Sequence, residues 1–280
     1  MRTFAKRVLM LIASLCVAFT LTLSIQAEAK SKESKPLTAT QYIKDENGKW
    51  VNDNPSTKYK YDKKGRLVKL IDPKETQTWT YNKRGYVTKH KLYQDGNWVE
   101  TVTTKYRGNK IKSVTEKDDE ETKKSIYYYK GGKLRTIKTY INGRLYFKEK
   151  YKYKGKKLIE SVERRCKTNK IQERKKYKDN KLYKRILYYS YETYTYTYDK
   201  KGNLVEETSK KPDGIIYRIK YTYNKHWDCV KKEYSVDGKI LDCSIYTYIY
   251  DKNNNILEQY EKYEDASRDE VYEEKIVYTY

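Results

Sequence analysis

The sequence has almost none of the residues and motifs from which enzyme active sites are commonly built. Its 280 residues include two histidines, His90 and His226, which lie far apart in the chain. No Gly-rich phosphate loop, His-Glu-x-x-His run or nucleophile elbow occurs. The sequence therefore predicts a protein that is not an enzyme and that has neither a metal site nor an organic cofactor.

Proline and glycine are also scarce, with 4 and 12 residues respectively. Low hydropathy combined with a net charge of +24 is typical of disordered chains. The 34 tyrosines argue against disorder, because tyrosine favours β-strands and can bury its ring while its hydroxyl stays in water. We therefore expect an ordered, Tyr-rich β protein.

The chain begins like a secreted protein. Residues 1–7 are basic, residues 8–25 are apolar, and Ala27-Glu28-Ala29 is a site that a signal peptidase accepts. The apolar run is also long enough for an uncleaved membrane anchor. Cleavage is the favoured interpretation, which makes residues 1–29 a signal peptide, residues 30–41 a polar linker and residues 42–280 the folded domain. The protein is then secreted or at the cell surface, with no stable membrane insertion after cleavage.

The mature chain is strongly basic. Removal of residues 1–29 takes away three basic residues and one acidic residue, which leaves a charge of +22. Such a field attracts polyanions, including anionic envelope polymers and nucleic acid, and carries no information about the fold.

A hairpin motif recurs from residue 42 to the end. In Tyr196–Glu206, two tyrosines alternate with threonine, Asp199 opens a type I turn, and Gly202 takes the left-handed position of a three-residue loop. Other copies have a two-residue loop. The motif predicts cross-strand pairs of a tyrosine with an aliphatic residue: Tyr61–Leu67 (with Gly65 in the turn), Tyr81–Val87, Tyr106–Ile111, Tyr129–Leu134, Tyr153–Leu158, Tyr177–Leu182, Tyr198–Leu204 and Tyr250–Ile256.

A second set of turns joins the hairpins, with Asp-Gly or Asn-Gly at residues 95, 142, 213 and 237. Read as two-residue loops without bulges, these turns keep the tyrosines on one face of the sheet and place Leu70 and Ile137 on the other. The predicted fold is all-β: an elongated, twisted antiparallel meander of about ten Tyr-rich repeats and about twenty strands, with enough twist to curl into a spiral.

The copies YKYDKKGRLVK and YTYDKKGNLVE resemble the YD repeats of bacterial Rhs and wall-associated proteins. The resemblance covers residues 42–280 and implies a β-repeat fold in an extracellular setting. In that family the repeats wind into a shell, often around a toxin. This chain is far shorter than such a shell and ends inside the motif at Tyr280, so the toxin function is not carried over.

Four aromatic residues are candidate binding residues. Trp227 stands where sister turns have glycine, next to His226, so either the turn differs there or strain serves a contact made by an exposed tip. Trp50 and Trp98 follow other turns. Rings at hairpin tips on a basic sheet can stack on sugars, and a packing role is the alternative.

Three cysteines, Cys166, Cys229 and Cys243, remain after cleavage. The predicted register places Cys229 on the tyrosine face and Cys243 on the other, so we expect no bridge between them.

These observations favour a non-enzymatic binding or structural surface for an anionic envelope polymer, a glycan or another protein. Two alternatives stay open: a remnant or partner of a toxin-delivery shell, and a non-specific nucleic-acid binder, which secretion makes less favoured.

Overall fold

The computed structural model describes residues 35–280 except 46, 54, 267 and 269. Residues Lys35–Tyr280 form one compact unit. The predicted signal peptide and residues 30–34 of the predicted linker lie outside the described residues. The first strand begins at Thr38, before the expected start of the domain at residue 42. No helix in the described part of the chain is long and apolar enough to cross a membrane.

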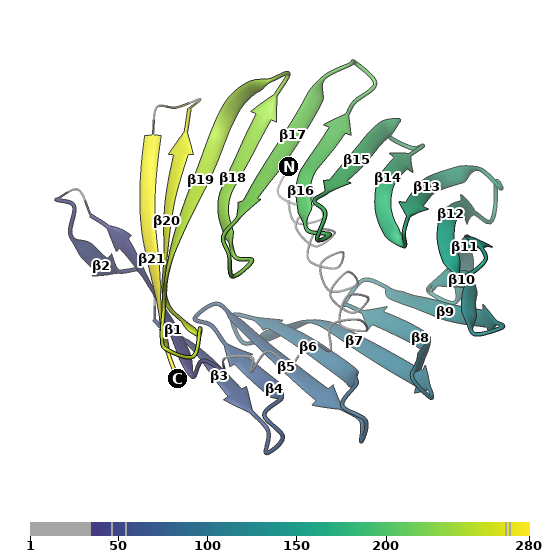
Figure 1. Cartoon of the computed structure of the whole chain (residues 1–280). Helices are drawn as coiled ribbons and strands as arrows, with labels where there is room; N and C mark the ends of the chain where they lie inside the picture. The colour runs from purple at the N-terminus through teal and green to yellow at the C-terminus, as the bar shows by residue number, and fades with distance from the viewer. Residues whose placement is uncertain (1–34, 46, 54, 267, 269) are drawn as a thin grey trace. The chain divides into compact units, whose positions relative to one another are not determined.

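Every regular element among the described residues is a β-strand (Figure 1). The strands are β1 (Thr38–Lys44), β2 (Trp50–Asn52), β3 (Thr57–Tyr61), β4 (Leu67–Ile71), β5 (Glu75–Tyr81), β6 (Val87–Gln94), β7 (Asn97–Arg107), β8 (Lys110–Lys117), β9 (Thr122–Lys130), β10 (Lys133–Ile141), β11 (Arg144–Lys154), β12 (Lys157–Arg165), β13 (Ile171–Lys178), β14 (Lys181–Leu187), β15 (Glu192–Tyr198), β16 (Leu204–Lys210), β17 (Ile216–Tyr223), β18 (Cys229–Val236), β19 (Lys239–Tyr250), β20 (Ile256–Asp265) and β21 (Glu270–Thr279).

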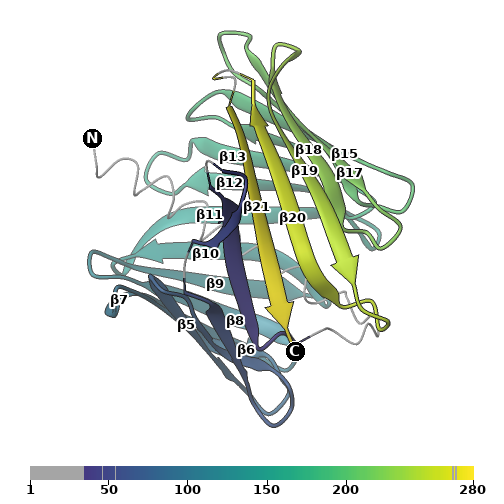
Figure 2. The same cartoon turned by 90° about the vertical axis from the view of Figure 1, so that its left-hand side faces the viewer.

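The sheet closes on itself, so the predicted open meander or spiral is wrong. Strands β3 to β21 pair antiparallel in chain order, and β1 pairs with β21 from Thr38–Thr279 to Ile43–Glu274 and with β3 at Thr38 and Ala39. Figure 2 shows this seam, where β1 lies beside β21. Because β2 pairs with β1 outside the ring, the barrel has 20 strands. Closure removes the two free edges that an open twisted sheet would expose.

The motif hairpins have the predicted cross-strand pairs. All eight tyrosines lie opposite their aliphatic partners, and Tyr223 with Cys229 forms a ninth pair of this kind. In the Tyr198 copy, Asp199 Oδ1 accepts hydrogen bonds from the backbone N–H groups of Lys201 and Asn203, at 2.9 and 2.8 Å. The Asn203 side chain and these backbone donors lower the pKa of Asp199. The acidic residue of the motif therefore shapes the turn.

Each motif hairpin also contains a β-bulge, which the sequence analysis did not predict. The register shifts by one residue directly after the aliphatic partner, so that Thr197 faces Glu206 while Tyr198 faces Leu204. The same shift occurs in the other eight motif hairpins. A bulge inserts one unpaired residue and increases the local right-handed twist. Nine such kinks in one sheet favour curvature, which is a physical reason for closure.

The bulges correct the predicted faces. Leu70 lies opposite Tyr59, and Ile137 lies opposite Tyr127, so both are on the tyrosine face. The loop at Asp213-Gly214 has three residues, with Lys211 N donating to Ile215 O, and the loop at Asn142-Gly143 is followed by a further bulge. The motif tyrosines still share one face, because each bulge residue is offset by a second extra residue further along the chain, either in a loop or in another bulge.

The two faces are therefore distinct and are named for their residues. The Tyr face carries the motif tyrosines, and the Lys face carries the alternate residues, such as Lys60, Lys152, Lys176 and Lys220. Of the 13 described residues that are buried, ten lie on the Tyr face: Ala39, His90, Val102, Thr104, Ile111, Val114, Thr139, Ser161, Leu187 and Ser244. Side chains converge on the concave side of a closed sheet, so the Tyr face is the inner wall and the Lys face the outer wall.

The tyrosine hydroxyls connect neighbouring hairpins. Tyr223 Oη donates to the carbonyl oxygen of Leu204 at 2.8 Å, where the ladder between β16 and β17 has ended at Glu206–Lys220. The same bond recurs around the ring, from Tyr81 to Leu67, Tyr106 to Val87, Tyr198 to Leu182, Tyr248 to Cys229 and Tyr280 to Ile256, at 2.7 to 2.9 Å. The hydroxyl satisfies a carbonyl beside the bulge that no strand partner reaches. Phenylalanine at these six positions would leave that carbonyl without its hydroxyl donor.

We expect Tyr223→Phe to lower the free energy of unfolding by about 1 kcal/mol, because it removes one such hydrogen bond and keeps the ring. Urea denaturation measures the change. Tyr128→Phe, at an exposed position of the Lys face, is the control and is expected to have little effect. Equal losses in the two variants would contradict the role assigned to the hydroxyl.

Candidate polyanion-binding surface

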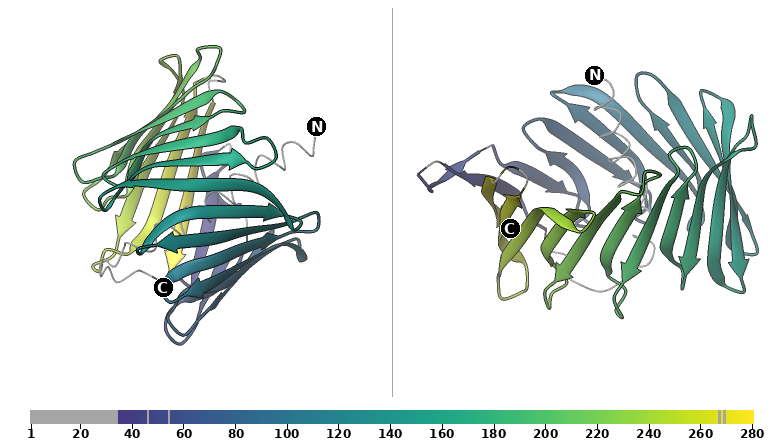
Figure 3. Two further views of the ribbon diagram at one scale, coloured as in Figure 1. Left: turned by 90° about the vertical axis from the view of Figure 1, so that its right-hand side faces the viewer. Right: turned by 90° about the horizontal axis from the view of Figure 1, so that it is seen from above.

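The outer wall carries many cations along its strands. Between β10 and β14, the Lys face carries a group of cations that we call the basic wall: Lys138, Lys148, Lys150, Lys152, Arg164, Arg174, Lys176 and Lys184. These strands form the part of the barrel that faces the viewer in the left panel of Figure 3. Glu160, the acidic residue among them, is 3.7 Å from Arg174 Nε. The basic wall is therefore a concentrated positive surface.

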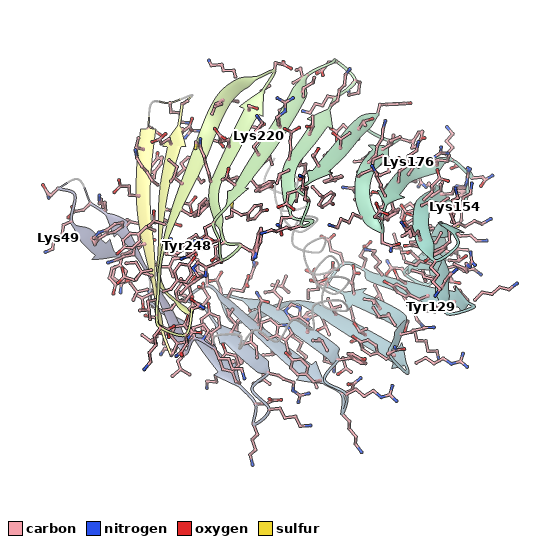
Figure 4. The ribbon with its side chains drawn as sticks, viewed as in Figure 1. Lys49, Tyr129, Lys154, Lys176, Lys220 and Tyr248 are labelled. Carbon is pink, nitrogen blue, oxygen red and sulfur yellow. The ribbon has the colours of Figure 1, made fainter. Side chains whose placement is uncertain are left out.

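Several of these cations stand directly opposite one another. Lys148 lies between Lys138 on β10 and Arg164 on β12, and Lys176 faces Lys184. Like charges opposite each other on one face of a sheet are destabilising. Similar pairs flank three turns at the end of this wall: Lys130–Lys133, Lys154–Lys157 and Lys178–Lys181. Figure 4 labels Lys154 and Lys176 on β11 and β13. A bound row of anions would relieve this repulsion.

The two ends of the barrel differ in charge. Because strands alternate in direction, all nine motif turns lie at one end, which we call the motif rim. The residues from each motif tyrosine to its partner include 18 lysines or arginines and five aspartates. The acidic run Asp118–Glu121 joins β8 to β9 at the opposite rim and is largely exposed. The motif rim thus extends the basic wall.

The structure does not bring the four predicted aromatic residues together. Trp50 packs at the seam, where its ring is 6.0 Å from that of Tyr260 and lies near Lys44 and Lys275. Trp98, 38% exposed, lies at the opposite rim and donates through Nε1 to Thr101 Oγ1 at 2.9 Å. Only His226 and Trp227 are at the motif rim.

The turn that contains Trp227 has the same form as its sister turns. The prediction that the turn differs at this position is therefore wrong. Asn224 N donates to Asp228 O, and Trp227 N donates to Asn224 O, as the corresponding groups do in the Asp199 turn. Trp227 has φ +73°, the value that Gly65 also adopts. The His226 ring centroid is 4.5 Å from that of Tyr250, and Lys201 Nζ is 4.0 Å from the indole centroid of Trp227. A bulky residue thus occupies a strained backbone position at the rim.

A charged row on the inner wall was not found by sequence reasoning. Glu149, Glu163 and Glu173 face one another on the consecutive strands β11, β12 and β13. Lys175 Nζ is 2.8 Å from Glu173 Oε2 and 3.5 Å from Glu149 Oε1, and it reaches across the buried Ser161. Arg185 also contacts Glu173. The outer two carboxylates thus have cationic partners, and Glu163 stands between them.

The surroundings set the charges in this row. Burial, together with the Glu149 and Glu173 carboxylates, raises the pKa of Glu163 to about 7. Burial alone would lower the pKa of Lys175, but Glu149 and Glu173 more than offset it and raise that pKa above its usual value. Among the described residues, no group of three or more His, Cys, Asp or Glu side chains is arranged to hold a metal ion.

The three cysteines are free thiols in the described structure. Cys229 lies opposite Tyr223 on the Tyr face, and Cys243 lies opposite Glu233 on the Lys face. The predicted placement on opposite faces is confirmed. A bulge between Tyr234 and Ser235 shifts the register between β18 and β19 by one residue without moving Cys243 to the Tyr face.

Comparisons with known proteins find structural similarity at low sequence identity. No family model and no curated protein matches the chain. Similar solved structures include a porin-like protein from Bacteroides uniformis ATCC 8492, with 11% identity, TM-score 0.38 and coverage of 88% of this chain and 98% of that chain. Another is a porin-like protein from Bacteroides vulgatus ATCC 8482, with 11% identity, TM-score 0.37 and coverage of 88% and 99%.

The resemblance to YD repeats of Rhs and wall-associated proteins is overturned. No family model supports it, and the pairing of β1 with β21 makes one closed 20-strand barrel where the resemblance implied a winding shell. The repeated turns reflect a requirement of local geometry: a tyrosine, an acidic or amide residue and a left-handed residue form the same bulged hairpin wherever they occur in this ring.

Proposed function

We propose that the protein is a non-enzymatic barrel, secreted or at the cell surface, whose basic wall binds an anionic polymer of the envelope. The observation that supports this most directly is the set of like-charge pairs on adjacent strands, Lys138–Lys148, Lys148–Arg164 and Lys176–Lys184. Cations on neighbouring strands repeat about every 4.8 Å, which suits a chain of closely spaced anionic groups better than a single ion.

The same surface argues against insertion of the barrel into a lipid bilayer. A membrane barrel presents an apolar band to lipid, and a lysine or arginine at the bilayer midplane costs roughly 2–4 kcal/mol. A single strand of the outer wall, β11, has lysine at three successive outward positions: Lys148, Lys150 and Lys152. We therefore place the outer wall in water, where it can meet a polymer, and propose no stable membrane insertion.

The test measures affinity for dextran sulfate, inorganic polyphosphate and duplex DNA at low and high salt. We expect salt-sensitive binding of the first two, because bound polymer releases counterions. Lys148→Glu should weaken binding roughly tenfold, or by about 1.4 kcal/mol. The same change should raise the melting temperature slightly, because it turns two repulsive pairs into attractive ones.

Lys60→Glu is the matched control. It makes the same change in charge and likewise replaces a like-charge pair, Lys60–Lys69, but it lies on β3, away from the basic wall. Its effect on binding should be small. Equal losses for the two variants would reduce the interaction to net charge, tighter binding of DNA than of the other polymers would favour a nucleic-acid binder, and no salt-sensitive binding would remove the proposal.

A further inference from the structure

Trp227 is under backbone strain that its neighbours in the fold avoid. The equivalent positions of sister turns have φ +73° at Gly65, +95° at Gly202 and +63° at Asn254. These are residue types that adopt left-handed conformations readily, whereas a bulky residue there is a genuine outlier. Such outliers persist where the surrounding structure holds them, and they cluster at functional positions.

The base of this turn is held firmly. Asn224 Oδ1 accepts hydrogen bonds from the N–H groups of His226 and Asp228, at 2.8 and 3.0 Å. Tyr250 Oη donates to Asp228 Oδ2 at 2.6 Å and accepts from Asn224 Nδ2 at 2.8 Å. These bonds tie the turn to β19, so the strain at Trp227 is not relieved by a change in the loop.

The indole is presented outward among cations. Trp227 is 45% exposed, and Lys201 from the preceding motif turn lies 4.0 Å from its ring centroid. Lys200 and Lys225, in the same two turns, are also exposed. The cation–π contact orients the ring and keeps an ammonium group next to it. An aromatic surface and positive charge are thus available to one ligand at the same place.

This inference rests on the proposed function. We propose that the anionic polymer is a glycan and that Trp227 contacts it directly. A sugar ring packs against the indole, while the anionic substituent of that sugar contacts Lys201 and its neighbours. Proteins that bind single-stranded nucleic acid use successive aromatic residues as stacking platforms. Among the described motif turns, Trp227 is a single exposed indole on a basic rim, which fits one ring of a charged glycan better than a run of bases.

The experiment compares the parent, Trp227→Gly and Asn254→Gly in binding to dextran sulfate, inorganic polyphosphate and single-stranded DNA. Trp227→Gly restores the residue of the sister turns, so a correctly folded barrel is expected, with a melting temperature close to that of the parent. Dextran sulfate binding should weaken about fivefold, the effect of losing about 1 kcal/mol of ring contact, while polyphosphate binding stays the same. Asn254→Gly should change neither.

Each other result overturns the inference. Unchanged dextran sulfate binding would show no sugar contact, an equal loss for polyphosphate would show an effect of charge alone, and a larger loss for single-stranded DNA would show a base-stacking site. If Trp227→Gly fails to fold, Trp227→Asn, which copies the residue at position 254, gives the same comparison. Failure of the parent to bind polyphosphate would instead overturn the proposed function, so the two are distinguishable.

Discussion

A disulfide between positions 40 and 277 is expected to raise the free energy of unfolding by as much as about 5 kcal/mol, because it closes a loop that spans nearly the whole barrel. Thr40 and Val277 are directly paired across the seam and lie on the same face. Antiparallel partners have the separation that a disulfide requires. The bridge should form when Thr40→Cys and Val277→Cys are combined with replacement of Cys166, Cys229 and Cys243 by alanine.

The control moves one cysteine by one residue. Ile276 precedes Val277 and lies on the Tyr face, so Thr40→Cys with Ile276→Cys should give free thiols or bridges between molecules. Mobility on a non-reducing gel and thiol alkylation distinguish the products, and urea denaturation with and without reductant measures the stabilisation. If the 40–277 variant forms bridges between molecules and none within one molecule, the closed ring is contradicted.

The second large effect is expected at Glu163. Its folded pKa of about 7 exceeds the ordinary value of 4.5, so below about 4.5 the acid is protonated in both folded and unfolded states and the penalty is absent. As pH rises to about 7, the unfolded chain loses this proton first, and stability falls. Glu163→Gln should therefore stabilise the barrel by roughly 1–3 kcal/mol at pH 8, allowing for partial solvent screening, and be neutral at pH 4.

Denaturation of parent and variant at several pH values gives this difference directly. Glu160→Gln is the matched control, because it lies on the same strand but faces outward between Lys152 and Lys176. Loss of that carboxylate should lower stability slightly. If the Glu163 variant gains no stability at pH 8, the ionised Glu163 carboxylate does not destabilise the folded barrel.

The sequence predicts the hairpins of this protein well, because each depends on a few neighbouring residues. Asp199 and Gly202 specify a turn, and the turn places Tyr198 opposite Leu204. The bulge that follows has no comparable signal. It depends on how the downstream strand meets the next hairpin, where Tyr223 bonds to the Leu204 carbonyl. The predicted faces of Leu70 and Ile137 were wrong for this reason.

The closure of the sheet and the positions of the charged surfaces could not be predicted from the sequence, because both depend on pairing between residues far apart in the chain. The partners Thr38 and Thr279 are separated by almost the whole domain, and nothing local indicates that two strand edges meet. The basic wall and the glutamate row depend on register between strands, which the unforeseen bulges change. Trp227 was recognisable, because it replaces glycine within a repeated pattern, although its contact with Lys201 required the arrangement of adjacent turns.

The alternation of strand direction around the ring also limits how such a protein can change its size in evolution. Adjacent strands are antiparallel all the way round, so the last can join the first in this way only if the number of strands is even. Duplication or loss of one complete hairpin adds or removes two strands and keeps tyrosines inside and lysines outside. Loss of a single strand would leave the ends running parallel. Barrels of different diameter that keep this pairing therefore differ from one another by whole hairpins.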